Sequence, residues 1–257
     1  PSYDTCQHTR SLASSQIYSR HTKSCGANIT SIVQLQHIVK IIHNVPEANG
    51  YIQGSFMLDT QAIAEDGSRL DIDTIEKTLK QGLEGKFSNQ DILVLIPDHT
   101  RSIPLPMLFQ MLADILDDVN RLDFMVALGT HPPLSEERLM ELVGITYEER
   151  NGTYRHIGLY NHEWDNGDAL LKIGKIKKKH IREYMGDLWH ESLDHSVPVT
   201  INRKIEDYDR MLILSPVFPH EVVGFSGGAK YLFPGISGQE IINTTHWMGA
   251  LAGVMGT

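Results

Sequence analysis

The fold of this chain is decided by the run DILVLI at residues 91–96, which Pro97 and Asp98 follow. A continuous apolar run that ends in Pro-Asp is typical of a strand covered on both faces, as strands are inside a parallel sheet. We therefore predict a central parallel strand here, with Asp98 in the loop beyond its carboxyl end.

Helical and strand-like patterns alternate around this run. Apolar residues recur at helical spacing over 72–83 and over 104–119, and Ser135 can cap a third helix that ends near Leu142. Further strands are predicted at residues 122–128, 154–160, 197–202 and 211–217. This order predicts an α/β fold with an open, mostly parallel sheet and helices on both faces.

The start of the chain carries no comparable pattern. Only SIVQLQHIVKIIH at 31–43 is rich in apolar residues, and it suits an amphipathic helix and a buried strand equally well. We leave residues 1–50 unassigned and expect residues 51–257 to form the α/β domain.

Composition narrows the classes of function. A chain of 257 residues, 41% of them hydrophobic, can build one large domain or two small ones. Its net charge of −9 argues against a nucleic-acid surface, because phosphate backbones recruit basic residues, and KIKKK at 175–179 is interpreted as a solvated face. We expect a small-molecule partner and no nucleic acid.

The cysteines, the apolar runs and the first residues of the sequence bear on the cellular location of the protein. Cys6 and Cys25 both lie in the unpatterned start, so neither a disulfide framework nor a cysteine metal site is predicted. No apolar run approaches the ~20 residues of a membrane span. The polar start PSYDTCQHTR lacks the pattern expected of a signal peptide. We expect no membrane partner and a cytoplasmic location.

Polar side chains follow several of the predicted strands. Asp98, His131, His162 and His220 each come a few residues after an apolar run. In an open α/β sheet, ligands bind in the crevice beyond the carboxyl ends of the strands. We therefore expect these four groups to face one crevice, the alternative for each histidine being a loop residue exposed to water. For His162 the two interpretations carry equal weight.

A glycine-rich segment, PHEVVGFSGGAK at 219–230, follows the last predicted strand. Its glycines permit positive φ and close approach to a ligand, as a backbone nest for an anion requires. It is not a Walker loop, because tyrosine follows Lys230 where a serine or threonine would hold magnesium. Ser226 and the amides of Gly227 and Gly228 can hold a phosphate, and a tight structural turn explains the same residues.

These motifs together resemble the N-terminal domain of the nickel-dependent lactate racemases and related 2-hydroxyacid racemases and epimerases. The resemblance covers the chain from about Asp91 onward. Its elements are IPDHTR at 96–101, LGTHPP at 128–133 and the glycine-rich segment. The spacing agrees too, with ten residues from His220 to Lys230 and sixteen from Lys230 to His246.

The resemblance implies a Rossmann-like, cofactor-binding domain and a racemase or epimerase of a 2-hydroxy acid. Hydride would leave C2 for a nickel-pincer nucleotide (pyridinium-3,5-bisthiocarboxylic acid mononucleotide) tethered to Lys230, and would return to the opposite face. His246 would complete the nickel coordination. His131 and His220 would be the paired bases, since an imidazole serves in both protonation states near neutral pH.

The resemblance also implies which residues contact the cofactor and how the cofactor is delivered. Asp98, Thr100 and Arg101 would contact the cofactor or the substrate, the structural alternative being an ion pair between Arg101 and Asp98. Ser226, Gly227 and Gly228 would hold the nucleotide phosphate. Separate maturation enzymes are implied as partners, and a homo-oligomer stays open.

Two departures from the family concern the substrate and the end of the chain. Pro132 follows His131 where the lactate enzymes carry an arginine, so lactate is not assumed as substrate. The sequence ends at Thr257, before the smaller C-terminal substrate domain of the family. We therefore expect weak turnover from this chain alone, and fraying of the His246 helix beyond about Met248.

Two other classes of function remain compatible with these residues. One is a hydrolase or lyase with zinc or iron held by His131, His220 and His246. The other is a non-catalytic small-molecule-binding module of the same fold. An adduct on Lys230 distinguishes the racemase from both.

Overall fold

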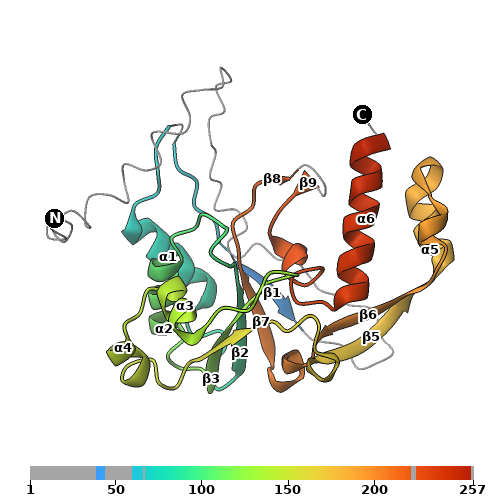
Figure 1. Ribbon diagram of the computed structural model, residues 1–257. Coiled ribbons are helices and arrows are strands. Elements are labelled where there is room, and N and C mark those ends of the chain that lie inside the picture. Colours follow the sequence, from blue (N-terminus) through green and yellow to red (C-terminus); the bar gives the residue numbers. More distant parts are fainter. Residues whose placement is uncertain (1–38, 44–59, 66, 221–223, 256–257) are drawn as a thin grey trace, which may run out of the picture. The chain divides into compact units, whose positions relative to one another are not determined.

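A computed structural model describes residues 39–43, 60–65, 67–220 and 224–255 (Figure 1). The chain divides into two compact units, residues 1–33 with 64–69, and residues 34–63 with 70–257. The described part of the first unit is a short turn in which the Ser68 amide and hydroxyl both donate to the Glu65 carbonyl. The expected boundary at residue 50 stays a prediction. The second unit holds every helix and strand of the described residues.

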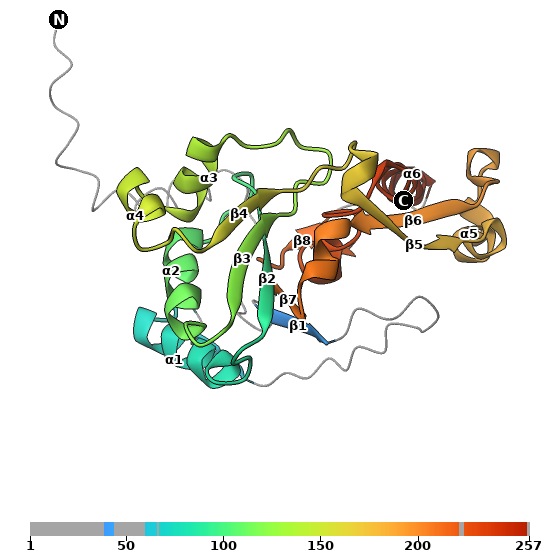
Figure 2. The same cartoon turned by 90° about the horizontal axis from the view of Figure 1, so that it is seen from below.

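A five-stranded sheet in the order β1-β7-β2-β3-β4 forms the centre of this unit (Figure 2). Its strands are β1 (Val39–His43), β2 (Asp91–Ile96), β3 (Arg121–Val126), β4 (Gly158–Asn161) and β7 (Arg210–Leu214). Strands β7, β2, β3 and β4 are parallel, and β1 pairs with β7 in the antiparallel sense. The prediction of an open, mostly parallel sheet with β2 at its centre is confirmed.

Alternation along β2 divides the apolar core between the two faces of the sheet. Ile92, Val94 and Ile96 belong to a cluster with α1 (Ile72–Leu83), α2 (Leu105–Ile115) and α3 (Glu136–Val143). These three helices therefore cover one face, and the short helix α4 (Tyr147–Asn151) follows them (Figure 1).

The opposite face is covered by short segments. Leu93 and Leu95 pack with Ile205 and Tyr231, which lie in the 3-10 helices η5 (Arg203–Asp207) and η6 (Gly228–Tyr231). Two further strands, β8 (Pro219–His220) and β9 (Gly224–Phe225), pair as a small antiparallel ribbon just before η6. Helical structure therefore flanks both faces, as the sequence predicts.

A separate two-stranded sheet pairs β5 (Leu170–Ile176) with β6 (Val197–Asn202) in the antiparallel sense. The bounds of β6 match the prediction, but its partner is β5 and not the central sheet. Between the two strands lie α5 (Lys178–Met185), η3 (Gly186–Leu188) and η4 (Glu191–Leu193), and η2 (Gly167–Ala169) precedes β5.

Helix α6 (Gln239–Met255) packs against this second sheet and α5 (Figure 1). The prediction that it frays beyond Met248 is wrong. Met248 and Leu251 pack against the buried cluster that includes Ile181 and Val197, and this packing outweighs the low helix propensity of the glycines. No helix in the described part of the chain is both long and apolar enough to cross a membrane.

The strand order creates a switch point at β2. The chain moves from β2 to β3 and β4 on one side, and then returns to form β7 on the other side of β2. At such a point the loops after adjacent strands diverge and leave a crevice at the carboxyl edge of the sheet. A ligand-binding site is therefore expected among the segments that follow β2, β3 and β7.

Candidate active site

The loop after β2 is organised around the buried carboxylate of Asp98. This residue is 5% exposed and follows β2 directly after Pro97. One of its oxygens, Oδ1, accepts from the Thr100 amide at 3.0 Å and from the Thr100 hydroxyl at 2.6 Å. The two bonds close a local turn and fix the direction in which the carboxylate points.

The other carboxylate oxygen of Asp98 contacts His131, in the loop after β3. Oδ2 of Asp98 pairs with Nδ1 of the His131 imidazole. The backbone amide of His131 donates to the Leu128 carbonyl at 3.0 Å. The His131 side chain is 47% exposed, so the pair has one buried and one accessible partner. The expectation that Asp98 and His131 share one edge of the sheet is confirmed.

Charge and hydrogen bonding keep Asp98 ionised. Burial acts to raise the pKa of Asp98, but the bonds from Thr100 and His131 outweigh it and place the pKa below its usual value. An ionised acceptor beside Nδ1 selects the tautomer in which Nδ1 carries the proton. Nε2 of His131 is then left as the basic nitrogen.

Arg101 extends the same hydrogen-bonded chain toward solvent. Its Nη1 donates to the Thr100 hydroxyl at 2.9 Å, and that hydroxyl in turn donates to Asp98. The ion pair of Asp98 is with His131 and not with Arg101. Arg101 is exposed, so its guanidinium remains accessible to an anion.

The glycine-rich segment folds back onto the end of β7. Ser215, fully buried, accepts from the Gly228 amide through its hydroxyl at 3.1 Å. The Ser226 hydroxyl accepts from the Phe218 amide at 3.0 Å. Gly227 has φ of +79°, and a Cβ there would collide with the Pro216 carbonyl oxygen. These contacts support the interpretation as a tight turn, and phosphate binding by these residues stays a prediction.

Lys230 lies on η6, whose backbone is tied to the His131 loop. The Lys230 amide donates to the Gly227 carbonyl at 3.1 Å, and its carbonyl accepts from the Gly235 amide at 3.0 Å. The Gly235 carbonyl accepts in turn from the Gly129 amide at 2.9 Å. The segment that carries Lys230 and the loop that carries His131 are thus joined through Gly235.

Tyr231, also in η6, packs against β2 in the cluster that contains Leu93 and Leu95. Its phenol is buried, and burial raises its pKa above the usual range. The charges of Arg101 and Asp98 also act on this phenol, in opposite directions. No sequence pattern singled out Tyr231 beyond its place after Lys230.

The other predicted site residues lie in segments at or after the end of β7. His220 is on β8 and half-buried, whereas His246 is on α6 and exposed. Asp98, Thr100, Arg101 and His131 are brought together by the contacts described above. That His220, Lys230 and His246 face the same space stays a prediction.

His162 has a different role from the one predicted. It is 1% exposed, its Nε2 donates to the Ser237 carbonyl at 2.8 Å, and its Nδ1 accepts from the Asn202 side-chain amide at 3.0 Å. Both ring nitrogens are therefore engaged inside the protein. The prediction that His162 faces the crevice is wrong, and so is the alternative that it is exposed to water.

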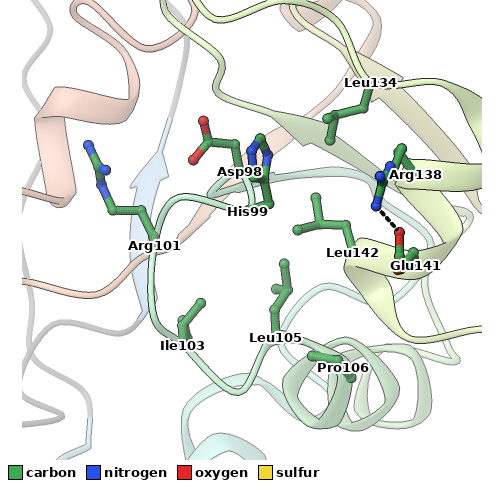
Figure 3. Close-up of a pocket in the computed structure, with 10 residues that line it drawn as sticks. All are labelled: Asp98, His99, Arg101, Ile103, Leu105, Pro106, Leu134, Arg138, Glu141 and Leu142. Atoms are coloured by element: carbon green, nitrogen blue, oxygen red, sulfur yellow. Dashed lines mark hydrogen bonds and ion pairs between the residues drawn. The ribbon is translucent and has the colours of Figure 1, made fainter. Parts of the chain in front are cut away.

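A cavity of about 490 Å³ adjoins Asp98 (Figure 3). It lies between the loop that leads from β2 into α2 and the segment around α3. Its apolar lining is Ile103, Leu105, Pro106, Leu134 and Leu142. Its polar lining is Asp98, His99, Arg101, Arg138 and Glu141. The sequence motifs identified two of these residues, Asp98 and Arg101, and missed the others, which ordinary loop and helix patterns supply.

Within the described residues, no group of three His, Cys, Asp or Glu side chains is arranged to hold a metal ion. A zinc or iron site built from His131, His220 and His246 therefore finds no support there. A metal that takes a single protein ligand needs no such group.

Comparison with known proteins places most of the chain in one family. Residues 70–254 match the family model described as the lactate racemase N-terminal domain. The lactate racemase of Lactiplantibacillus plantarum is 24% identical over 184 residues, which are 68% of this chain and 38% of that protein. The lactate racemase of Thermoanaerobacterium thermosaccharolyticum is 24% identical over 178 residues, 66% of this chain and 34% of that protein.

A solved structure is similar as well. The crystal structure of a protein from Thermotoga maritima matches with a TM-score of 0.57 and 29% identity, over 70% of this chain and 42% of that one. The chain thus spans well under half the length of the relatives it matches.

Proposed function

Because this chain belongs to the family of lactate racemase N-terminal domains, we propose that it is the cofactor-bearing domain of a racemase or epimerase of 2-hydroxy acids. The observation that carries the proposal is the contact between Asp98 and His131 at the carboxyl edge of the sheet. It supplies an oriented base at the place where open α/β folds bind their ligands.

His131 acts as the base for the substrate hydroxyl. Asp98 holds Nδ1 in its protonated form, so Nε2 accepts the hydroxyl proton as C2 becomes planar. The carboxylate then stabilises the imidazolium that forms. The buried Asp98 provides the negative charge, while the accessible His131 contacts the substrate.

His220 is the second base in this proposal. Inversion at C2 requires that the hydroxyl be deprotonated when the substrate presents either face, so two bases on opposite sides are needed. His220 lies on β8, in the segment that follows β7 across the switch point from the His131 loop. Its placement after a neighbouring strand supports this role.

The residues that would hold the nickel-pincer nucleotide are Lys230 and His246. When bound, this group supplies a reversible hydride acceptor, which avoids removing the weakly acidic C2 hydrogen as a proton. The donor set fits, because a neutral imidazole is a good nickel ligand, and the exposed imidazole of His246 would provide it. Lys230 offers a primary amine on a segment whose backbone is hydrogen-bonded at both sides. We also propose that separate maturation enzymes deliver the group.

Arg101 is proposed to bind an anion at the same edge, either the substrate carboxylate or the nucleotide phosphate. Its planar guanidinium matches both groups, and its bond to Thr100 orients it. Only one of its nitrogens is used in that bond, so further donors remain for the ligand.

The test measures both the covalent modification of Lys230 and racemisation. The protein is expressed with the maturation enzymes of the family, and intact mass with peptide mapping locates any adduct. We expect a sulfur-containing adduct on Lys230 that Lys230→Ala abolishes and the exposed Lys172→Ala keeps. The loaded protein should interconvert the enantiomers of a 2-hydroxy acid with the weak turnover expected of this chain alone. An unmodified Lys230 in folded protein from such cells contradicts the proposal.

A further inference from the structure

The cavity shares Asp98 with the proposed catalytic pair, and no residue of the segment that carries Lys230 is among its lining residues. Asp98 lines the cavity and also contacts His131. The cavity extends from there between the loop before α2 and α3, the side of the sheet covered by α1 to α3. A molecule held at His131 therefore has this space next to it.

The walls of the cavity divide into a charged edge and an apolar floor. Figure 3 shows Asp98 and Arg101 at one edge, with Ile103, Leu105 and Leu142 below them. These apolar side chains belong to the loop after β2, to the start of α2 and to α3. A ligand held at the charged edge of the cavity would have its remaining atoms beside these apolar side chains.

The far end of the cavity has little net charge. Arg138 pairs there with Glu141, with 2.6 Å between Nη1 and Oε2. A second carboxylate on the ligand would gain from Arg138 but would be repelled by Glu141. The end away from Asp98 therefore favours an uncharged group.

We propose that this cavity receives the side chain of the substrate and selects a 2-hydroxy monocarboxylate whose side chain is apolar and larger than methyl. The substrate class rests on the function proposed above, and the size and polarity of the side chain rest on the cavity. A volume of about 490 Å³ is in the range of pockets for whole small ligands. The methyl group of lactate would leave most of it unfilled.

The test measures binding to the unloaded chain, so that it does not depend on racemisation. Isoleucine and leucine methyl groups are isotope-labelled, and NMR follows titration with lactate, 2-hydroxy-4-methylpentanoate and 2-hydroxysuccinate. We expect the branched ligand to bind at least about tenfold more tightly than the other two. Its methyl groups should give NOEs to Ile103, Leu105 and Leu142.

Two variants show whether the cavity causes the preference. Leu142→Trp fills the cavity and should remove the advantage of the branched ligand. Ile173→Trp, on the exposed surface of β5, is the matched control and should keep it. If Leu142→Trp does not fold, the NOEs of the unaltered chain decide alone.

Several results would overturn the inference. They are equal affinities for the three ligands, NOEs to methyl groups outside the cavity, or an unchanged preference in folded Leu142→Trp. Displacement of the branched acid from these methyl groups by nicotinic acid mononucleotide would assign the cavity to the cofactor instead. Failure of racemisation with a retained size preference would contradict the proposed function only, and racemisation without a size preference would contradict this inference only.

Discussion

The Nδ1 atom of His131 contacts Oδ2 of Asp98, although the two residues lie in loops after different strands. The contact exists because β2 and β3 are adjacent and parallel, so that their carboxyl ends meet at one edge. Thr100 occupies the other oxygen of Asp98 and leaves Oδ2 directed at the imidazole. Three loop residues thus produce an oriented base without a contribution from any helix.

Asp98→Asn should slow racemisation by roughly 10²- to 10⁴-fold, the usual contribution of an oriented base. The asparagine amide donates to Nδ1 and so favours the tautomer with the proton on Nε2, which cannot accept the hydroxyl proton. The measurement is kcat of cofactor-loaded protein against pH, with the exposed Asp168→Asn as control. Equal kcat in the two variants would rule out a role for the carboxylate.

Gly227→Ala should destabilise the fold by roughly 1–3 kcal/mol, because φ is +79° and the added Cβ meets the Pro216 carbonyl oxygen. Relief of the collision would shift η6, and the Lys230 adduct should form less completely. Urea unfolding and intact mass measure the two effects. Gly167→Ala is the matched control, since nothing lies within 4 Å of a Cβ there.

The parts of the fold that could be predicted are those whose apolar patterns are complete. Strands β2 and β3 are covered on both faces. After Asp91, β2 is a continuous apolar run, and β3 is apolar apart from Arg121 and Asp123. Strand β5 was missed because it is largely exposed and contains Lys172, Gly174 and Lys175. Helix α5 was missed because only Ile181 and Met185 of its residues are buried, in a run otherwise basic and polar.

The candidate site could be predicted as a set of residues but not as a set of contacts. Strand ends identified Asp98 and His131, and parallel pairing brings them to one edge. The same rule failed for His162, because Asn202 and Ser237, which bury and bond it, are remote in sequence. Side-chain direction at a strand end depends on such remote partners, and no local pattern encodes them.

Tyr208→Phe should destabilise the fold by about 1–3 kcal/mol, since it leaves Oδ2 of the buried Asp123 carboxylate without a hydrogen-bond donor, while Oδ1 keeps the Gly158 amide. The Tyr208 hydroxyl donates to Asp123 Oδ2 at 2.6 Å, and Arg121 Nε is 3.8 Å from the same oxygen. The free energy of unfolding in urea is the measurement. Tyr184→Phe serves as control, because Tyr184 is 87% exposed and its hydroxyl should contribute little.

His162 should make the stability of the protein fall in mild acid. Burial lowers the pKa of His162 and outweighs the bond to Ser237 and the nearby charges of Glu163 and Asp165, which raise it. The unfolded chain protonates this imidazole near pH 6.5 while the folded chain does not. The unfolded state therefore binds more protons below about pH 6.5, and the free energy of unfolding decreases as the pH falls from there toward the folded pKa.

His162→Gln tests this directly. The variant keeps a polar side chain at the site but cannot titrate, so its unfolding free energy should change less between pH 7.5 and pH 5.5 than that of the unaltered protein. The exposed His180→Gln should retain the full change. Protonation would place a donor on Nδ1 opposite the Asn202 amide, so the loss of stability should accompany a weaker contact between His162 and Asn202 at the end of β6. An identical pH dependence in His162→Gln and the unaltered protein would assign the acid sensitivity to other groups.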